Sequence, residues 1–333
     1  MPSYFYMNDF PLSVAKGGKE EQLRLVSMIM GDKFDGVYNI HDNNAPQISS
    51  EDTLHCFGDT PLFFYFVKFL EGKKIAPNLV ISPSFYRRKP YFYKFISLIP
   101  RFIPNWFSER EKLFKSFDKI IVNSEFEKRY LSKIFALNES KIIVVYNSFD
   151  VVNTEVEFSA EDNKPYCLCV SHLSERKNIL NLLLGAEQFY KDTGIPLLIA
   201  GEPRFHKYDN LVKFEKLLKS CSGVKFIGLK SRDELSGLYR NCLFHILPSF
   251  IETPGISNLE AASFGKPIVV GDFPVLREYF GDHAIYSGFK VRDIYSSMLM
   301  ASSIARSGPI AYDLKRFEKK TIAKRYLDII LSS

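Results

Sequence analysis

Short apolar runs alternate with amphipathic, helix-like segments along most of the chain. Apolar runs of this length, bounded by loop residues, are typical of strands buried in a sheet. In the first half we expect strands at residues 4–7, 37–40, 53–57, 79–82, 120–123 and 142–146. In the second half we expect them at 166–170, 197–200 and 224–228, in the run that ends at residue 247, and at 267–270. Helical stretches separate several of these runs, which is the order of parallel βαβ sheets and predicts an α/β protein.

The length of the chain and one break in the pattern predict two domains. A chain of 333 residues is long enough for two domains of typical size. Residues 151–164 are polar, acidic and without a clear period, which is typical of a linker. We therefore expect domains at residues 1–150 and 151–311, followed by a charged helical segment at 312–333. The cleft between two domains is a preferred place for a ligand.

Residues 247–271 are expected to form a strand, a loop, a helix and a second strand that together carry two carboxylates. Glu252 lies in the loop and Glu260 on the helix, with seven residues between them. Ligands of open α/β sheets bind just outside the carboxyl ends of strands, and a helix that begins after Gly255 presents free N–H groups to phosphate. An ionised Glu260 can accept two hydroxyl hydrogen bonds. The alternative is that both glutamates are surface charges on an ordinary crossover.

A second polar loop, residues 171–178, opens the next expected helix. Lys177 at a helix N-terminus facing the cleft could hold a diphosphate, with Arg176 beside it, although such a pair is more often simply solvated. The side chains of this helix that we expect to face inward are Leu180, Leu183, Leu184 and Ala186.

Two glycines, Gly17 and Gly18, stand near the start of the chain at the mouth of another expected helix. Two adjacent glycines let the backbone approach an anion closely and supply free N–H donors. A flexible loop is the alternative interpretation of this pair.

Composition indicates a globular protein of the cytosol. Hydrophobic residues make up 46% of the chain and charged residues 25%, with a formal net charge of +6. The 5 cysteines are odd in number, include no Cys-x-x-Cys pair and lie mostly in apolar runs, so we expect reduced core residues. The first residues lack the pattern of a secretory leader, and no window reaches the length of a membrane span. We therefore expect a cytoplasmic location.

The segment from residue 85 to residue 115 interleaves basic and aromatic side chains. Cations beside rings suit the headgroup and acyl regions of a membrane surface. Rings beside a phosphate-binding groove would also suit single-stranded nucleic acid. A packed helix with a solvated basic face explains the sequence equally well. The candidates for contact with an acceptor or a membrane are Arg87, Arg88, Lys89, Lys94 and Trp106.

Residues 247–271 resemble the retaining glycosyltransferases of family four, which have the GT-B fold and the pattern Glu-Gly-Phe-Gly-x-x-x-x-Glu-Ala before a Gly-x-Pro strand. Thr253 and Pro254 replace the usual Gly-Phe, which stiffens the loop and leaves the carboxylate spacing unchanged. The resemblance implies two Rossmann-like domains, the first for the acceptor and the second for the nucleotide sugar, with parallel sheets facing a central cleft and a last helix that crosses back to the first domain. The matching residues are Pro248, Ser249, Glu252, Gly255, Leu259, Glu260, Ala261, Gly265 and Pro267.

The resemblance also implies roles for individual residues. Glu252 and Lys177 would be catalytic, with Glu252 on a sugar hydroxyl and Lys177 on the diphosphate, and Glu260 would hold the ribose hydroxyls. His172 stands where the family has an arginine, so either His172 or Arg176 would supply the second cation. The donor-binding set that the resemblance implies is Gly17, Gly18, His172, Arg176, Lys177, Gly228, Leu229, Glu252, Thr253, Gly255, Ile256 and Glu260.

The activity that the resemblance implies is retaining, metal-independent transfer of a sugar from a nucleotide diphosphate sugar to a hydroxyl of a glycan or lipid-linked acceptor, as in surface polysaccharide or O-antigen synthesis. No Asp-x-Asp cluster is present, so we expect no metal and no cofactor. Ser84 stands where the family often has a catalytic histidine, and His55 is better explained as a structural residue.

Two other functions stay open from the sequence. One is a GT-B sugar-nucleotide epimerase, and the other is a non-catalytic basic module that binds nucleic acid or membrane. For the transferase we expect a nucleotide-sugar donor and a glycan or lipid-linked acceptor as partners, and no nucleic acid. Peripheral contact with an anionic membrane, on the inner face of the cell membrane, is compatible with the basic and aromatic segment.

Overall fold

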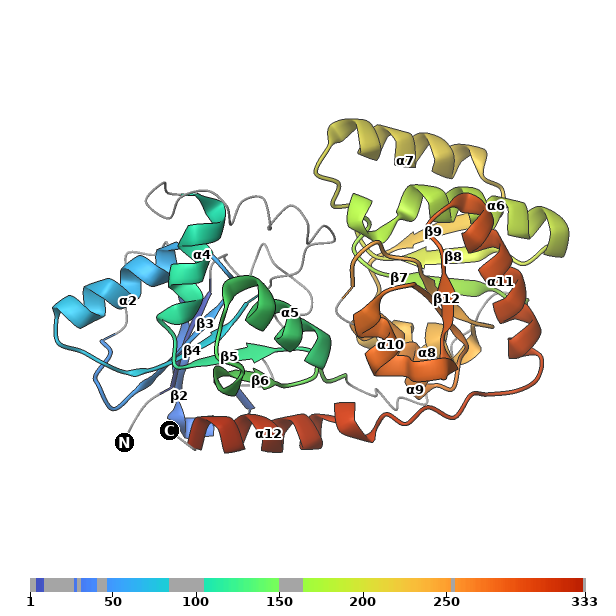
Figure 1. Ribbon diagram of the computed structural model, residues 1–333. Coiled ribbons are helices and arrows are strands. Elements are labelled where there is room, and N and C mark those ends of the chain that lie inside the picture. The colour runs from blue at the N-terminus through green and yellow to red at the C-terminus, as the bar shows by residue number, and fades with distance from the viewer. Residues whose placement is uncertain are drawn as a thin grey trace. The chain divides into compact units, whose positions relative to one another are not determined.

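The computed structural model describes residues 4–8, 27–28, 31–40, 47–83, 105–149, 164–252 and 255–331. The chain divides into two compact units, which are described separately. The first unit consists of Met1–Ser148 with Arg316–Ser333, and the second consists of Phe149–Lys315. Figure 1 shows both units and labels most of their helices and strands.

The first unit is built on a six-stranded parallel sheet with the order β2-β1-β3-β4-β5-β6. Its strands are β1 (Tyr4–Asn8), β2 (Phe34–Asn39), β3 (Thr53–Phe57), β4 (Asn78–Ser82), β5 (Lys119–Val122) and β6 (Ile142–Val144). The expected strands of this half are therefore confirmed, and only their ends differ by a few residues. The apolar runs were readable because strands of a parallel sheet are buried on both faces.

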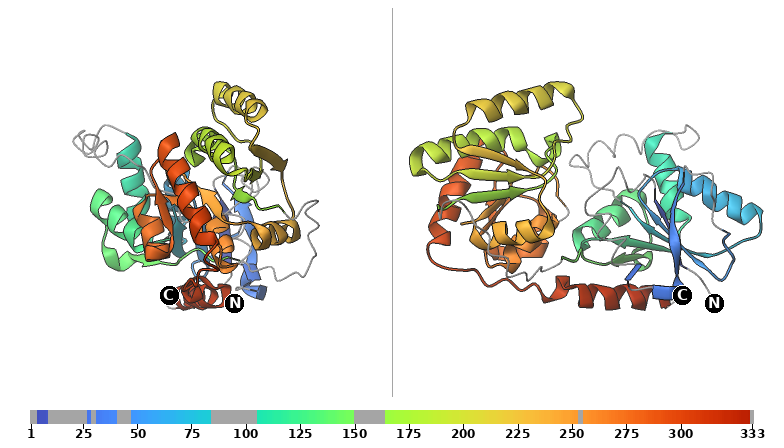
Figure 2. Two further views of the ribbon diagram at one scale, coloured as in Figure 1. Left: turned by 90° about the vertical axis from the view of Figure 1, so that its right-hand side faces the viewer. Right: turned by 180° about the vertical axis from the view of Figure 1, so that it is seen from behind.

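Helices cover both faces of this sheet. They are α2 (Leu62–Gly72), α4 (Trp106–Lys115), α5 (Glu125–Phe135) and α12 (Lys319–Leu331), with short 3-10 turns at Gly31–Lys33 and Glu139–Lys141. Side chains alternate between the faces along each strand, so the sheet separates two hydrophobic cores. One core joins β1 and β3 to α2, α4 and α5. In the other, Ile322, Tyr326 and Ile329 of α12 pack against Tyr4 and Tyr6 (Figures 1 and 2).

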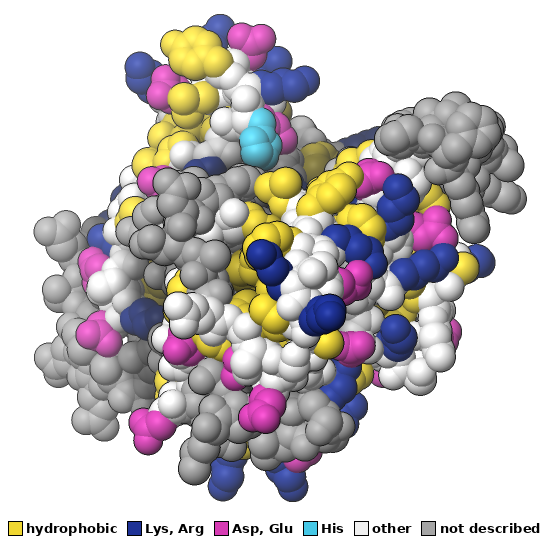
Figure 3. Space-filling view, turned by 90° about the vertical axis from the view of Figure 1, so that its left-hand side faces the viewer, with side chains coloured by type: hydrophobic (Ala, Val, Ile, Leu, Met, Phe, Trp, Pro, Cys, Tyr) yellow, Lys and Arg dark blue, Asp and Glu magenta, His cyan; other side chains and the backbone are white. Residues whose placement is uncertain are grey.

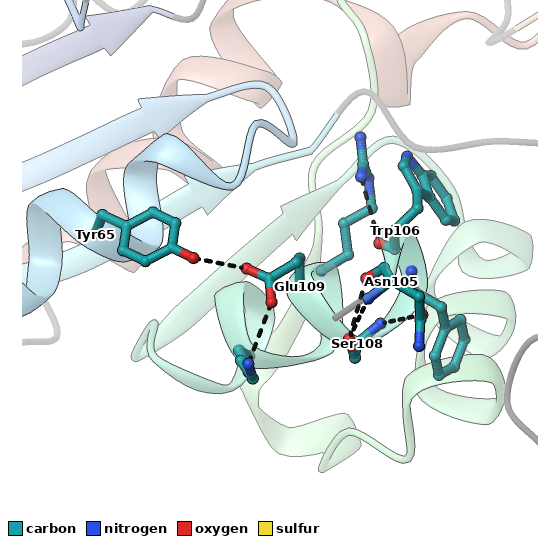
Figure 4. A network of polar contacts seen from close by, with 8 residues as sticks. Tyr65, Asn105, Trp106, Ser108 and Glu109 are labelled. Carbon is teal, nitrogen blue, oxygen red and sulfur yellow. Dashed lines mark hydrogen bonds and ion pairs between the residues drawn. The ribbon is translucent and has the colours of Figure 1, made fainter. Parts of the chain in front are cut away.

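Local capping explains where the helices of the first unit begin. The Asn105 side chain accepts hydrogen bonds from the backbone N–H groups of Phe107 and Ser108, both at 3.0 Å. The Ser108 hydroxyl accepts one from Asn105 N at 3.1 Å, which completes a capping box at the start of α4 (Figure 4). Ser124 caps α5 in a simpler way, by accepting from Glu127 N at 3.0 Å.

The second unit is also built on a six-stranded parallel sheet, with the order β12-β11-β10-β7-β8-β9. Its strands are β7 (Cys167–Val170), β8 (Leu197–Ala200), β9 (Val224–Gly228), β10 (His245–Leu247), β11 (Ile268–Gly271) and β12 (Ile285–Ser287). After β7 the chain builds β8 and β9 on one side, and it then returns to build β10, β11 and β12 on the other. The boundary between β7 and β10 is therefore a topological switch point, where the loops after neighbouring strands run apart and ligands of such sheets bind.

The helices of the second unit lie between these strands in sequence. They are α6 (Ile179–Thr193), α7 (Tyr208–Ser220), α8 (Arg232–Asn241), α9 (Ile256–Ser263), α10 (Pro274–Phe280) and α11 (Val291–Ala305). Short 3-10 turns of this unit lie at Glu175–Lys177 and Gly281–His283, and a further one at Lys315–Phe317 spans the boundary to the segment that returns to the first unit. Helices α6 and α11 pack side by side (Figure 2) because Gly185 leaves room for the Ile294 side chain, which would be 3.0 Å from a Cβ at that glycine.

Two expectations about helices were wrong in detail. Leu184 does not face inward but is 41% exposed, and Leu182 fills the core beside the correctly expected Leu183. The C-terminal helix begins at Lys319 rather than at residue 312. Tyr312 belongs to the second unit, where its hydroxyl donates to the Lys266 carbonyl at 3.0 Å. Contacts with the rest of the fold decide which leucines of α6 are buried and where the C-terminal helix begins.

Candidate functional site

Lys177 and Glu252 meet at the switch point of the second sheet. Lys177 ends the 3-10 turn after β7, and Glu252 lies in the loop after β10, the strand beside it. The Lys177 ammonium donates to Oε2 of Glu252, and the Ser249 hydroxyl donates to the same oxygen at 3.0 Å. Both charged residues are buried, with 7% of Lys177 and 5% of Glu252 exposed. A cation and an anion 75 residues apart in the chain thus form one buried pair.

The backbone of the two loops holds this pair in place. Ser249 N donates to the Leu247 carbonyl, which turns the chain sharply as it leaves β10, and Phe250 N donates to the Arg176 carbonyl, each at 2.9 Å. The second of these bonds ties the Glu252 loop to the Lys177 loop. Gly255 starts α9 with a positive φ of 79°, and a Cβ there would lie 3.1 Å from Cγ of Glu252. Only glycine fits this turn without moving the carboxylate.

The electrostatics of the pair follow from its burial. Burial alone would raise the pKa of the Glu252 carboxyl, but the Lys177 ammonium, with Arg176 farther off, holds this pKa below its usual value. Burial lowers the pKa of the Lys177 ammonium, and Glu252 opposes that shift. The charge of each partner therefore depends on the other. An anion brought to this place would compete with Glu252 for the ammonium group.

Glu260 lies on α9 and is held by a buried tyrosine. The Tyr239 hydroxyl on α8 donates to Oε2 of Glu260 at 2.9 Å. Burial, together with the Glu260 charge, raises the pKa of Tyr239, so this hydroxyl keeps its proton. The Tyr239 ring is fixed between His245 and Phe264, with ring centroids 5.8 and 6.1 Å away. Glu260 itself is only half-buried, so solvent or a ligand can reach its carboxylate.

His245 and Asn258 are buried polar residues on the strand before and the helix after the Glu252 loop. His245 is fully buried at the start of β10, and its Nε2 accepts a hydrogen bond from Val170 N at 3.3 Å. Burial lowers the pKa of His245 to about 3, the neighbouring Asn258 side chain opposes this shift, and the Lys177 charge adds to it. Asn258 is buried in the first turn of α9, close to Gly255. These neutral groups support the start of the helix that carries Glu260.

The two candidates for the second cation differ in position. Arg176 is exposed, and its charge contributes to the lowered pKa of both Lys177 and Glu252. His172 lies earlier in the same loop and is half-buried. Between them, Glu175 accepts hydrogen bonds from the backbone of residues 206 and 207 and from the side chain of Asn210, at 3.2, 3.1 and 2.9 Å. Burial alone would raise the pKa of Glu175, but these donors lower it to about 2.

Gly228 and Leu229, two residues of the expected donor-binding set, lie at the edge of the sheet. Gly228 ends β9, the outermost strand, with a positive φ of 70°, and its carbonyl accepts from Gly201 N at 2.9 Å. Leu229 follows it and is 67% exposed. Two strands separate β9 from β10, so this pair does not touch the Lys177 and Glu252 pair. Ile256, the first residue of α9, is half-buried beside Gly255.

Several expected site residues lie outside the described residues. They are Gly17, Gly18, Arg87, Arg88, Lys89, Lys94 and Thr253. Of the acceptor and membrane candidates, Trp106 is described. It begins α4, and the Arg110 guanidinium lies 3.9 Å from its ring centroid while pairing with Asp59 at 2.6 Å (Figure 4 shows Trp106 at the start of the helix).

Two residues of the site were not singled out for it from the sequence. Ser249, which belongs to the matched pattern, donates a hydrogen bond to Glu252. The only local signal for this bond was that Ser249 precedes Glu252 by three residues in the same loop at the end of a strand. Tyr239 carried no signal for the site, because no spacing rule connects it with Glu260. His55, by contrast, is a structural residue. It is buried in β3, where Tyr4 OH contacts its Nδ1 and Ser82 Oγ lies 2.7 Å from its Nε2.

Two general features of the described residues bear on metals and on membranes. No group of at least three His, Cys, Asp or Glu side chains is arranged there to hold a metal ion. None of the helices described has the length and apolar character needed to cross a membrane.

Most of the second unit is similar to a known protein family. Residues 153–305 match the family model described as Glycosyl transferases group 1. The O-antigen chain mannosyltransferase of Salmonella typhimurium is 26% identical over 156 residues, a match that covers 47% of this chain and only 42% of that protein.

Solved structures extend the likeness to the whole chain. The Anabaena HepE protein in complex with UDP has a TM-score of 0.67 at 14% identity, covering 99% of this chain and 100% of that chain. A glycosyltransferase from Rickettsia africae has a TM-score of 0.65 at 13% identity, covering 99% of this chain and 98% of that chain. These two likenesses concern the fold. The chain therefore has the two-sheet GT-B fold seen in glycosyltransferases, and its residues 153–305 match the glycosyltransferase group 1 model.

Proposed function

We propose that the protein is a retaining, metal-independent glycosyltransferase. It would move a sugar from a nucleotide diphosphate sugar to a hydroxyl of a glycan or lipid-linked acceptor in the synthesis of a surface polysaccharide. The group 1 segment supports the transferase activity. The similarity to an O-antigen mannosyltransferase supports the choice of pathway, and the UDP in the HepE structure supports the class of donor.

The observation that carries the proposal is the buried pair of Lys177 and Glu252 at the switch point. A buried ion pair is weak evidence for stability, because the cost of removing both charges from water offsets much of their attraction. Apolar residues of similar volume would stabilise the same place as well or better. The pair is therefore better explained by function. An ammonium group held at the carboxyl end of a parallel sheet is suited to a diphosphate leaving group.

The proposed roles follow from the geometry. Lys177 would turn from Glu252 to the diphosphate as the donor binds, and Arg176 would add charge from the exposed side. Glu252, released from the ammonium group, would accept a hydrogen bond from a hydroxyl of the transferred sugar. Glu260 would accept from the ribose hydroxyls, since an ionised carboxylate has about four acceptor positions and Tyr239 occupies one of them.

The lowered pKa of Glu252 supports a reaction without an enzymic base. A general base works best with a pKa near the operating pH, whereas Lys177 holds the pKa of Glu252 low in the free protein, and in the donor complex the released carboxylate would be engaged by the sugar hydroxyl. We therefore assign the acceptor proton to the departing phosphate. The bond from the sugar C1 to the phosphate oxygen breaks, the acceptor oxygen forms a bond to C1 on the same face, and the phosphate oxygen takes the hydroxyl proton.

A panel of nucleotide sugars tests the donor site by thermal stabilisation. A donor at 100 times its dissociation constant should stabilise the protein by about 2.7 kcal/mol. Glu260→Ala should remove this effect, and the matched control Glu215→Ala, on the exposed side of α7, should retain it. Stabilisation that persists in Glu260→Ala would contradict the ribose assignment. Proton NMR of the product tests retention, and an inverted anomeric configuration would contradict it.

A further inference from the structure

Helix α2 of the first unit is apolar on its outward side as well as on its inward side. Phe63, Val67 and Leu70 are buried in the core. On the outward side, Leu62, Tyr65 and Phe69 are 41%, 56% and 57% exposed. Their spacing of three and four residues places them on one face of the helix. A surface helix normally carries polar residues there, so this apolar stripe is suited to contact with a further apolar phase.

Lysines border the stripe formed by Leu62, Tyr65 and Phe69. The Lys73 ammonium lies 5.7 Å from the centroid of the Phe69 ring, and Lys68 lies at the same distance from the Phe64 ring. Lys68 also pairs with Glu71 at 2.6 Å, so its charge is partly neutralised. Lys73 and the following Lys74, both exposed, leave this end of the helix positively charged. Long cationic side chains can lie along rings while their charged ends reach a polar surface.

The neighbouring helix α4 fixes the orientation of the stripe. The Tyr65 hydroxyl donates to Oε2 of Glu109 at 3.1 Å, and Figure 4 shows the two side chains pointing toward each other from α2 and α4. This hydrogen bond holds the Tyr65 ring in one orientation on the outward side of the helix, even though more than half of the side chain is exposed. Figure 3 faces the side on which α2 lies in Figure 1 and shows hydrophobic side chains exposed beside those of Lys and Arg.

We propose that this face of α2 docks on an anionic lipid surface. Rings for the acyl boundary and ammonium groups for anionic headgroups are the combination that an interfacial helix needs. Three outward side chains on one helix are too few for a stable protein interface, which buries roughly 1,000 Å² or more. A bilayer needs no matching partner shape. The inference deepens the proposed function, on which it rests for the idea of a lipid-linked acceptor.

Sedimentation with phospholipid vesicles tests the docking surface without any nucleotide sugar. The wild-type protein should bind vesicles that contain phosphatidylglycerol and bind pure phosphatidylcholine vesicles more weakly. Tyr65→Ser combined with Phe69→Ser should abolish binding to both. Lys73→Gln combined with Lys74→Asn should weaken only the binding to anionic vesicles, by about fivefold for each lysine, and should reduce its salt dependence.

Matched controls keep the result specific. Tyr208 and Val212 on α7 of the second unit are 77% and 42% exposed, so Tyr208→Ser combined with Val212→Ser removes a similar apolar surface elsewhere and should leave vesicle binding unchanged. Unchanged melting temperatures would show that all variants are folded. Wild-type protein that ignores phosphatidylglycerol vesicles, or a Tyr65 and Phe69 variant that binds like wild type, would overturn the proposal.

Two further readouts separate the possible failures. Sedimentation velocity that shows a wild-type dimer, lost in the Tyr65 and Phe69 variant, together with no vesicle binding, would make α2 a self-association face and overturn the lipid proposal. Nucleotide-sugar stabilisation should be the same in this variant as in the wild type. If nucleotide sugars stabilise neither the wild type nor this variant, while vesicle binding is strong in the wild type and lost in the variant, the docking proposal stands and the donor proposal fails.

Discussion

The two sheets of the protein bury ionisable groups in different ways. In the first sheet, His55 lies within β3, and both ring nitrogens have partners, Tyr4 on one side and Ser82 on the other. In the second sheet, Lys177 and Glu252 lie beyond the ends of β7 and β10, in two loops that separate at the switch point. Both places are buried. Only the second combines opposite charges with the edge of the sheet where a ligand can enter.

This difference shows that burial and a shifted pKa do not identify a functional site by themselves. Burial lowers the pKa of His55 to about 3, a large shift, yet the imidazole is neutral and its hydrogen bonds are satisfied. The shifts at Lys177 and Glu252 depend on each other, and an arriving anion would change both. A useful criterion is therefore whether the perturbing partner is one that a ligand can replace.

The largest effect is expected from Lys177→Met. Loss of the ammonium group should lower kcat by about 100- to 1,000-fold, because the leaving diphosphate loses a positioned charge. It should also destabilise the protein by about 3–5 kcal/mol, because the Glu252 charge remains buried without its partner. Urea unfolding and initial-rate kinetics measure the two effects. The double variant Lys177→Met with Glu252→Leu should recover most of the stability and none of the activity. Recovery of activity would contradict the assignment.

Tyr239→Phe tests whether the Glu260 carboxylate must be held in place. The variant loses a hydrogen bond to a charged group, which should cost about 1.5–3 kcal/mol of stability. We expect the donor KM to rise more than kcat falls. The preference for a nucleotide over its 2′-deoxy analogue should also shrink. A destabilised variant with an unchanged preference would show that Tyr239 supports the fold alone.

His55→Gln is the matching change in the first sheet. It should destabilise the protein by about 1–3 kcal/mol, because buried partners lose a hydrogen bond. The affinity for nucleoside diphosphates, measured by calorimetric titration, should stay at the wild-type value. A loss of affinity comparable with that of Tyr239→Phe would remove the distinction between the two sheets.

The pH dependence of stability gives the smallest expected effect. Burial lowers the pKa of His55 and of His245 to about 3, from an ordinary value of 6.5. Between these values the unfolded chain binds protons that the folded protein does not, so the free energy of unfolding falls as the pH falls. Each histidine contributes at most about 1.4 kcal/mol per pH unit. Urea unfolding at several pH values should show that His55→Gln reduces this slope by one proton. An unchanged slope would contradict the burial of a neutral His55.

The fold was largely predictable from the sequence, because strands buried on both faces give apolar runs that stand out from their surroundings. The strand at 53–57 and the helix that begins after Gly255 are examples. The orientation of α6 was less predictable. Apolar residues lie on more than one side of this helix, so its sequence does not show which side faces the core. Packing against α11 decides that Leu183 is buried and Leu184 is exposed. Helix α12 begins later than expected because Tyr312 is engaged with the second unit.

The candidate site was only partly accessible from the sequence. The loop that carries Glu252 and the turn at Gly255 have local signals, and the resemblance supplied their roles. The contact between Lys177 and Glu252 depends on β7 and β10 being neighbours, which no local pattern encodes. The bond from Tyr239 to Glu260 likewise depends on the packing of α8 against α9. Contacts of this kind follow from topology and cannot be read from spacing.

The central claim is that Lys177 and Glu252 are paired in order to receive a donor diphosphate. Calorimetric titration of a panel of nucleoside diphosphates into the folded double variant Lys177→Met with Glu252→Leu tests it most directly. The control is Lys68→Met with Glu71→Leu, which removes an exposed ion pair of the first unit. We predict that the wild type and the control bind the same nucleotide and that the double variant binds none. Wild-type affinity in the folded double variant would contradict the claim.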